Sequence, residues 1–403
     1  MNIAFREVEG TSVGYYALLG LLALVVMLGL GAAYYMESHG HIVTGMNNQI
    51  VWGMPHVFAV FLIVAASGAL NVASIGSVFG KSMYKPLAPL SALLAIAMLA
   101  GGLMVLMLDL GRADRLIVAM TYYNFKSVFA WNVFLYTGFF SIVAVYIWTM
   151  MDRKVNGYTK PAGVAAFIWR LMLTTGTGSI FGFIVAREAY DSALLAPMFI
   201  VMSFSYGLAV YLLVMMASYK LTGRELGDKV VNRLKNLQGT FIAGALYFVL
   251  VYHMTNMYFA KDHGVESFIL FDGNIFGKLF WFGQVLVGSL LPMGILFHPS
   301  IGKSRGWIAF AAAMVIAGGL AQMYVTIIGG QAYPIDMFPG MQVTSSFYDG
   351  VVHSYHPSLP ETMLGLGGVA VAGAITVFAI KILRFLPQSL SDDVVDSVHK
   401  KGD

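Results

Sequence analysis

The chain has 403 residues, of which 58% are hydrophobic and 11% are charged, and its formal net charge is +4. Soluble globular domains carry about 25% charged residues, so this composition excludes a soluble domain and predicts a polytopic membrane protein. Cysteine is absent from the sequence, which excludes disulfides, thiolate metal sites and cysteine-ligated iron–sulfur clusters held by this chain alone.

Ten stretches reach the roughly 20 apolar residues that a helix needs to cross a bilayer, so we predict an all-α membrane protein. The predicted spans are 13–35, 54–79, 87–108, 129–151, 162–186, 193–219, 239–260, 276–298, 306–328 and 359–386. Four helices, a basic connection and four more helices predict two four-helix bundles, with the last two spans as an appended pair. The predicted divisions are 1–151, 152–298 and 299–403, and a long loop, 329–358, lies in the third.

Basic residues are distributed unequally between the two sides of these spans. Of the 24 Lys and Arg residues, 17 lie on the side of the two termini, 6 lie on the opposite side, and Arg170 lies within the fifth span. The positive-inside rule therefore predicts cytoplasmic termini. Basic residues in the connections between membrane spans indicate the topology of the chain, so we expect no nucleic-acid binding.

Polar residues gather on the predicted exoplasmic side of the first four spans. Asp109 ends the third span, and a charge beside hydrocarbon needs a partner or a function. Arg112, three residues on, is the expected salt-bridge partner, and Gly111 is the expected helix end. His56 follows Pro55 at the start of the second span, where it either serves a site or bonds freed backbone.

The same side carries further candidates in later positions. His39 and His41 follow the first span, Arg115 follows Arg112, and Asn132 and Tyr136 lie one helical turn apart at the start of the fourth span. In the second half, we predict a possible polar site from residues at three helix ends, namely Arg187, Glu188, Asp191 and His253. Arg170 lies roughly 13 Å into the fifth span, and we expect it to extend toward the cytoplasmic surface or to serve an ion path.

Two adjoining motifs carry a resemblance to a known family. Residues 109–115 read DLGRADR and residues 127–132 read SVFAWN, and they resemble the polysulfide reductase membrane-subunit (NrfD-like) family, which usually has Pro at the position of Ala113. Residues 71–79, 262–270, 329–334 and 358–368 extend the similarity over the rest of the sequence, which looks most like the ten-helix DsrP-like branch of dissimilatory sulfur metabolism.

The resemblance implies a function and its partners. Members exchange electrons between a quinone and an exoplasmic iron–sulfur subunit, and they generally hold no redox cofactor. For this chain it implies menaquinone or ubiquinone as substrate, a periplasmic ferredoxin-like iron–sulfur partner, and a cytochrome or further membrane subunits as additional partners. It also implies the cytoplasmic membrane of a bacterium or archaeon, with the quinone near the exoplasmic ends of the first four helices and an acid at the Asp109 position taking part.

Quinol oxidation releases two protons with two electrons, so its site needs an apolar slot, hydrogen-bond partners and a proton acceptor. We predict Asp109 and His56 as the catalytic groups. The predicted quinone-binding residues are Asn132, Tyr136, Arg112, Arg115, His39 and His41.

Two other classes of function compete with this interpretation. A secondary transporter of a small anion or ion is compatible with two bundles, Arg170 and the glycine-interrupted stretch 174–183. A di-haem cytochrome needs facing histidine pairs, whereas only His56, His253 and His298 fall within or at the ends of spans, and His298 lies at the cytoplasmic end. We therefore expect neither haem nor a metal site in this chain.

Overall fold

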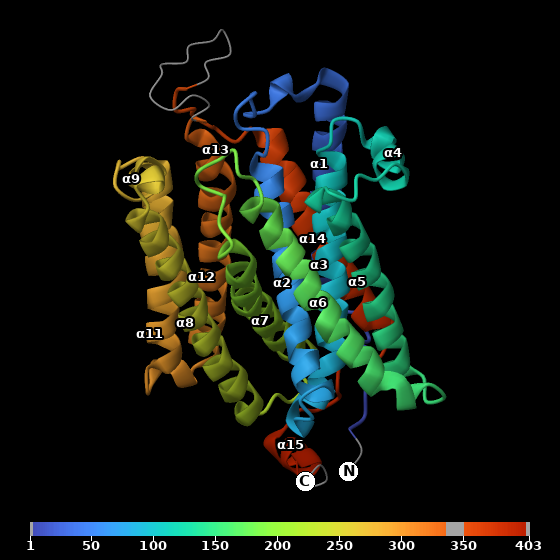
Figure 1. Ribbon diagram of the computed structural model, residues 1–403. Helices are drawn as coiled ribbons and strands as arrows, with labels where there is room; N and C mark the ends of the chain where they lie inside the picture. The colour runs from blue at the N-terminus through green and yellow to red at the C-terminus, as the bar shows by residue number, and fades with distance from the viewer. Residues whose placement is uncertain (1–2, 336–349, 400–403) are drawn as a thin grey trace.

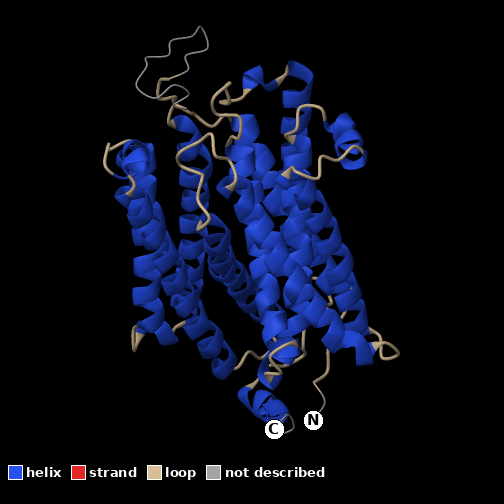
Figure 2. Ribbon diagram, viewed as in Figure 1, coloured by secondary structure: helices blue, strands red, loops and turns tan. Residues whose placement is uncertain are grey.

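The computed structural model describes residues 3–335 and 350–399. These residues form helices joined by loops, with no strand among them (Figure 2). Ten helical segments in the described residues are long and apolar enough to cross a membrane. The predicted all-α, multi-pass fold is therefore confirmed.

The spanning segments agree closely with the predicted ones. In sequence order they are α1 (Val13–His39), α2 (Met54–Ser77), η2 (Ser82–Leu87) with α3 (Ala88–Leu108), α5 (Val128–Met151), α6 (Thr159–Gly182), α7 (Leu195–Thr222), α8 (Asp228–Tyr258), α10 (Ile275–Lys278) with η6 (Leu279–Leu290) and α11 (Leu291–Phe297), α12 (Arg305–Tyr324) with η8 (Val325–Gly329) and α13 (Gly330–Ala332), and α14 (Leu359–Ile382). The shorter helices are η1 (His41–Val43), η3 (Ala113–Arg115), α4 (Leu116–Thr121), η4 (Asn156–Tyr158), η5 (Ala260–Asp262), α9 (His263–Leu270), η7 (Ile301–Lys303) and α15 (Asp392–His399).

Several boundaries differ from the prediction by a few residues, and the start of α8 differs most. Helix α8 begins at Asp228 rather than near residue 239, because its basic first turns continue the helix beyond the apolar run. The ninth span stays helical through Ala332, so the predicted loop 329–358 begins later than expected. Residues 336–349 of that loop lie outside the described part of the chain.

Helix α2 lies at the centre of the protein, where it packs against α3, α6, α7, α12 and α14. Its crossing with α7 depends on two glycines. A Cβ atom added to Gly68 would lie 1.5 Å from the Ser203 carbonyl oxygen, and one added to Gly207 would lie 2.1 Å from the Ala69 nitrogen. Small residues of this kind let two membrane helices approach closely.

The grouping of the helices differs from the predicted one. Helices α2, α3, α5 and α6 pack together, and α7, α8, η6 with α11, and α12 form a second group. The last two spans separate, because α12 packs on η6 and α7 whereas α14 packs on α1, α3 and α2. The pair that flanks the two bundles is therefore α1 with α14, and not the ninth span with the tenth.

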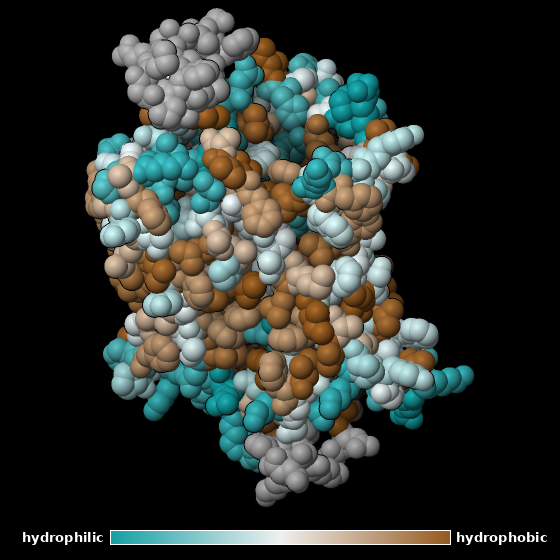
Figure 3. All heavy atoms as spheres, in the orientation of Figure 1, coloured by the Kyte–Doolittle hydropathy of each residue, from teal (hydrophilic) through white to brown (hydrophobic). Residues whose placement is uncertain are grey.

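The surface matches a membrane-spanning protein. On the face drawn in Figure 3, hydrophobic residues gather in a middle band and hydrophilic residues gather toward both ends. Both described ends of the chain lie at one end of the helices (Figure 1). We call the opposite end, where α1 ends at His39, α2 begins at Met54 and α3 ends at Leu108, the distal end.

Candidate functional site

A histidine and a buried carboxylate meet at the distal end of the first bundle. Helix α3 ends at Leu108 and is capped by Asp109, whose backbone N–H still donates to the Val105 carbonyl, and Gly111 then turns the backbone with φ +69°. His56 lies in the first turn of α2, just after Pro55. The His56 Nδ1 atom is 2.9 Å from Asp109 Oδ2, and the two side chains are 20% and 1% exposed.

This pair leaves polar atoms without hydrogen bonds. The ring and carboxylate are close enough for an ion pair, but they are not aligned for a hydrogen bond, and neither Asp109 oxygen has a hydrogen-bond donor among the described residues. Buried carboxylates normally receive such bonds, because burying an unpaired charge is costly. The pair therefore offers a hydrogen-bond acceptor and a proton acceptor to a group that enters from outside the protein.

The predicted salt bridge between Asp109 and Arg112 is wrong. The Arg112 Nε and Nη2 atoms donate to the two Asp114 carboxylate oxygens at 2.9 Å, and both side chains are exposed. The hydrogen bond from Arg112 lowers the pKa of the Asp114 carboxyl. Arg115 is exposed in the same turn. Arg112 therefore pairs within this turn and not with Asp109.

Aromatic rings line the neighbourhood of His56. Trp52 stacks on the His56 ring with centroids 6.0 Å apart, and it also contacts Phe129 at 6.0 Å and Phe181 at 5.7 Å. The buried Gln331 side chain fixes this segment, because it accepts from the Trp52 N–H and donates to the Trp52 carbonyl, each at 3.0 Å. The prediction did not assign Gln331 a role, because its partner is 279 residues away in the sequence.

Asn132 and Tyr136 lie on α5, beside α6. The Asn132 amide donates to the carbonyls of Val128 at 2.9 Å and Gly176 at 3.2 Å, while its buried Oδ1 has no hydrogen-bond partner among the described residues. Tyr136 is partly buried against the core. The contact between Trp52 and Phe129 links the start of α5 to His56, so one aromatic cluster connects these elements.

The two histidines after the first span take different positions. The His41 ring lies against Gly111, since a Cβ atom added there would be 3.1 Å from His41 Nε2. It is therefore close to the turn that follows Asp109. His39 is exposed, and its Nδ1 is 3.1 Å from the Tyr35 carbonyl on its own helix.

A second histidine–carboxylate pair lies at the distal end of the other bundle. The His253 Nδ1 atom is 2.7 Å from Glu266 Oε2, and the Asn256 amide donates to Glu266 Oε1 at 2.8 Å. The Glu266 side chain is 1% exposed. The prediction included His253 but missed Glu266, although an acid between apolar Val265 and Phe268 is a usable signal of burial.

Arg187 and Asp191, which were also predicted for the second bundle, have different partners. Arg187 donates to the carbonyls of Gln331 at 2.9 Å and Gln49 at 2.7 Å, whereas Asp191 pairs with Lys261 at 3.2 Å. Glu188 follows Arg187 in the same loop. Burial lowers the pKa of Arg187. This arginine therefore ties two loops together at the distal end.

Arg170 does not extend to the cytoplasmic surface as predicted. It is fully buried, its Nη2 donates to Asn71 Oδ1 at 2.9 Å and its Nη1 to the Ser67 carbonyl at 3.4 Å. The guanidinium carbon also lies 5.0 Å from the centroids of Phe167 and Phe204. Packing among α2, α6 and α7 therefore encloses this side chain.

Comparisons with known proteins give the family. The model of the polysulphide reductase NrfD family matches residues 42–335. The chain is 30% identical to the Hdr-like menaquinol oxidoreductase integral membrane subunit of Archaeoglobus fulgidus, over 98% of this chain and 100% of that one. It is 23% identical to a polysulfide reductase subunit of Wolinella succinogenes (71% and 96% covered) and 21% identical to the menaquinone reductase integral membrane subunit of Nitratidesulfovibrio vulgaris (89% of each). The matched family range begins in the loop before α2 and ends just after α13, so it contains both bundles, and the chain belongs to the polysulphide reductase NrfD family.

Proposed function

We propose that this chain is the quinone-reactive membrane subunit of a multisubunit oxidoreductase, with its quinone site at His56 and Asp109. The observation that carries the proposal is the buried Asp109 carboxylate, which lies beside His56 and receives no hydrogen bond from the described residues. Two of the relatives carry menaquinol or menaquinone in their names, which supports menaquinone as the substrate.

The geometry suggests how the residues act on a quinol. One ring hydroxyl donates to Asp109, which takes the proton as the two electrons leave the ring. His56 is 2.9 Å from that carboxylate and partly exposed, so it accepts the proton and releases it at the distal surface. The second hydroxyl loses its proton in the same way, which gives quinone, two protons and two electrons. Trp52 and Phe129 offer the apolar faces against which such a ring packs.

The electrons require an acceptor outside this chain, which has no cysteine to hold an iron–sulfur cluster. We propose an iron–sulfur partner subunit at the distal end, facing the exoplasm, and cytoplasmic termini in the cytoplasmic membrane. The 17 to 6 division of basic residues supports this orientation. The resemblance to DsrP-like subunits supports a role in sulfur metabolism, and the absence of haem from this chain stays a prediction.

The substitution Asp109→Asn tests the proposed site in the purified complex. It keeps the shape of the side chain but removes the proton acceptor, so quinol-dependent electron transfer should fall about 10²–10⁴-fold. Asp114→Asn is the matched control, since this neighbouring acid is exposed and bonded to Arg112. Assembled Asp109→Asn complex with unchanged quinol oxidation would refute the proposal.

A further inference from the structure

Two adjoining cavities lie in the second bundle, between α7, α8, η6 and α12. They share Val249, Gln284 and Gln322 in their walls. The volume open to the centres of water molecules is about 20 Å³ in one and about 10 Å³ in the other. A cavity needs about 10–15 Å³ by this measure to hold one water, so the cavities suit ordered water and are too small for a quinone ring.

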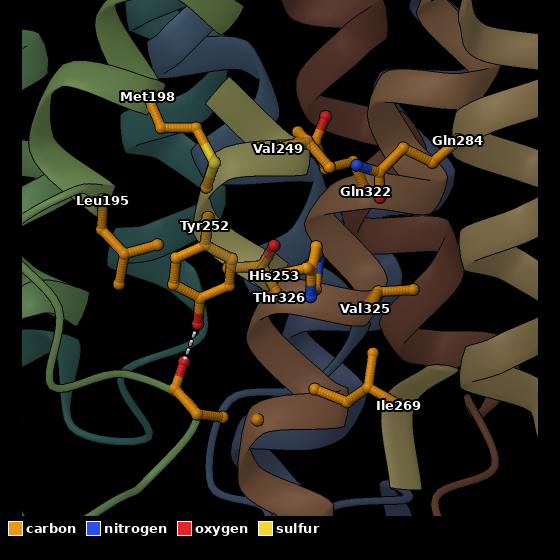
Figure 4. A pocket seen from close by; sticks show the side chains of 12 residues that line it. Leu195, Met198, Val249, Tyr252, His253, Ile269, Gln284, Gln322, Val325 and Thr326 are labelled. Carbon is orange, nitrogen blue, oxygen red and sulfur yellow. Dashed lines mark hydrogen bonds between the residues drawn. The ribbon is translucent and has the colours of Figure 1, made fainter. Parts of the chain in front are cut away.

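The first cavity reaches the histidine–carboxylate pair at the distal end. Figure 4 shows Tyr252 and His253 from α8 among its walls, together with Gln284 from η6 and Gln322 from α12. His253 in turn bonds Glu266, whose polar contacts among the described residues are His253 and Asn256. An imidazole and a carboxylate at 2.7 Å can share one proton, so this pair can take up a proton and give it back.

Polar side chains continue from this pair toward the middle of the bundle. The Gln322 Oε1 atom accepts a hydrogen bond from Tyr206, which lines the second cavity beside Ser205. The Gln238 amide donates to Ser205 Oγ at 3.2 Å, and the buried Gln238 Oε1 has no hydrogen-bond partner among the described residues. Gln238 lies ten residues after the start of α8 at Asp228, which is roughly 15 Å from that helix end.

The two π-helical segments of the described residues border these cavities. Gln284 and Ser289 belong to η6, where the Ser289 hydroxyl donates to the Gln284 carbonyl at 3.0 Å. Thr326 belongs to η8 and lines the first cavity. π-Helical turns are rare and are found frequently at functional sites, because they free backbone groups from regular pairing. The presence of both segments in the walls of one cavity is a second indication of a functional site here.

We propose that these residues form a proton path into the second bundle, entered at His253 and Glu266 and ending at Ser205 and Gln238. Protons pass along ordered water held by the side chains of Gln284, Gln322 and Tyr206, and each passage restores the starting protonation of Glu266. This path is separate from the site proposed for quinone, because it lies on α7, α8, η6 and α12 rather than on α2 and α3.

The absence of cysteine from the protein permits a direct test. Ser205→Cys places a single thiol at the inner end of the path, and infrared spectroscopy follows exchange of its S–H for S–D after transfer of the full-length protein in lipid to heavy water. Ser203→Cys is the control, because Ser203 is also buried on α7 but lies against Gly68 of α2. We expect the thiol at 205 to exchange at least about tenfold faster, since exchange in a dry core waits for local opening.

Two further variants test the route rather than the end point. Gln322→Leu and Glu266→Leu, each combined with Ser205→Cys, should slow the exchange to the rate of Ser203→Cys, whereas Asp272→Leu at the exposed distal surface should not. If Ser205→Cys does not fold, Ser289→Cys replaces it, because Ser289 lines the second cavity. Equal exchange at positions 205 and 203, or fast exchange that survives both leucine substitutions, would overturn the proposal. The experiment involves no quinone, so its failure would leave the function proposed for His56 and Asp109 standing.

Discussion

Glu361 gives the most quantitative prediction about the support of the candidate site. Its carboxylate is fully buried at the start of α14, where it accepts hydrogen bonds from the N–H groups of Gly45 and Ser358, each at 2.8 Å, and from the Tyr355 hydroxyl at 2.6 Å. The Tyr355 oxygen in turn accepts from the N–H of Met54, the first residue of α2. One carboxylate therefore joins α14, the loop after α1 and the helix that carries His56.

The substitution Glu361→Ala leaves these donors without an acceptor. Each buried, unpaired donor costs about 1–3 kcal/mol, and part of this is recovered because no charge remains buried, so the total loss is about 3–5 kcal/mol. Burial and the adjacent Glu361 carboxylate raise the pKa of Tyr355, so its hydroxyl stays protonated and is one of the groups left unpaired. Glu361→Gln keeps one oxygen for the two N–H groups and should lose only about 1–2 kcal/mol.

The assay is the half-life of the purified protein at a fixed raised temperature, because membrane proteins of this size unfold irreversibly. We expect Glu361→Ala to shorten it by at least about 10²-fold and Glu361→Gln by about 5- to 30-fold, if the lost contacts are absent from the transition state of unfolding. Glu37→Ala is the control, since Glu37 is exposed near the end of α1. A half-life for Glu361→Ala within twofold of the original would refute this reasoning. Equal damage from the alanine and glutamine variants would show that the charge matters, rather than the acceptor geometry.

Three further predictions concern other parts of the protein. Arg170 is buried, and no carboxylate contacts it among the described residues. The substitution Arg170→Met should therefore leave the free energy of unfolding unchanged or raise it by about 1–4 kcal/mol. A clear loss of stability would show that the hydrogen bonds of Arg170 to Asn71 and Ser67 outweigh the cost of the buried charge. Gly207→Ala should destabilise the protein by about 1–3 kcal/mol or more, because the added Cβ would lie 2.1 Å from the Ala69 nitrogen. Gly31→Ala is the control and should be tolerated, because a Cβ added there has no atom within 4 Å. Equal melting temperatures of the two variants would contradict the close crossing of α2 and α7. Reporter fusions after α15 should report the cytoplasm and an insertion in the loop after Ala332 should report the exoplasm, and the reverse pattern would overturn the proposed orientation.

The spans were predictable from the sequence because hydrocarbon imposes a length and a composition on each one. The packing of these spans could not be predicted, since an apolar composition does not indicate which helices contact one another. The α1–α14 pair depends on close approach at Gly29, where an added Cβ would lie 2.9 Å from the Gly367 Cα. The two glycines are far apart in the sequence, and nothing near either one predicts the other.

The acid of the candidate site could be predicted from the sequence, but the residue that pairs with this acid could not. Asp109 could be identified because it ends an apolar run, and Arg112 was the nearest opposite charge. A helix would place residues three apart on one face, but α3 ends at Leu108, just before Asp109, so the spacing rule no longer applied. His56 is the partner instead. It lies at the start of α2, which is at the distal end together with the end of α3. Glu266 and Glu361 were missed because an acid in a predicted connection or in a first helical turn is usually exposed.

The two histidine–carboxylate pairs differ in a way that fits the two roles proposed for them. Both lie at the distal end, and in both the Nδ1 atom faces a carboxylate that is 1% exposed. They differ in their surroundings, because Asp109 receives no hydrogen bond from the described residues whereas Glu266 receives one from Asn256. An acceptor left open suits an incoming ligand, and an acceptor already held in place suits repeated proton exchange.

The flanking helices also take part in the candidate site, although they lie outside the matched family range. That range ends at residue 335, yet Glu361 of α14 fixes the first residue of α2 through Tyr355. A Cβ added to Gly53, just before α2, would lie 2.4 Å from Glu361 Oε1, so the segment leading to His56 is packed directly against α14. The position of His56 beside Asp109 therefore depends on a helix that the family match does not include.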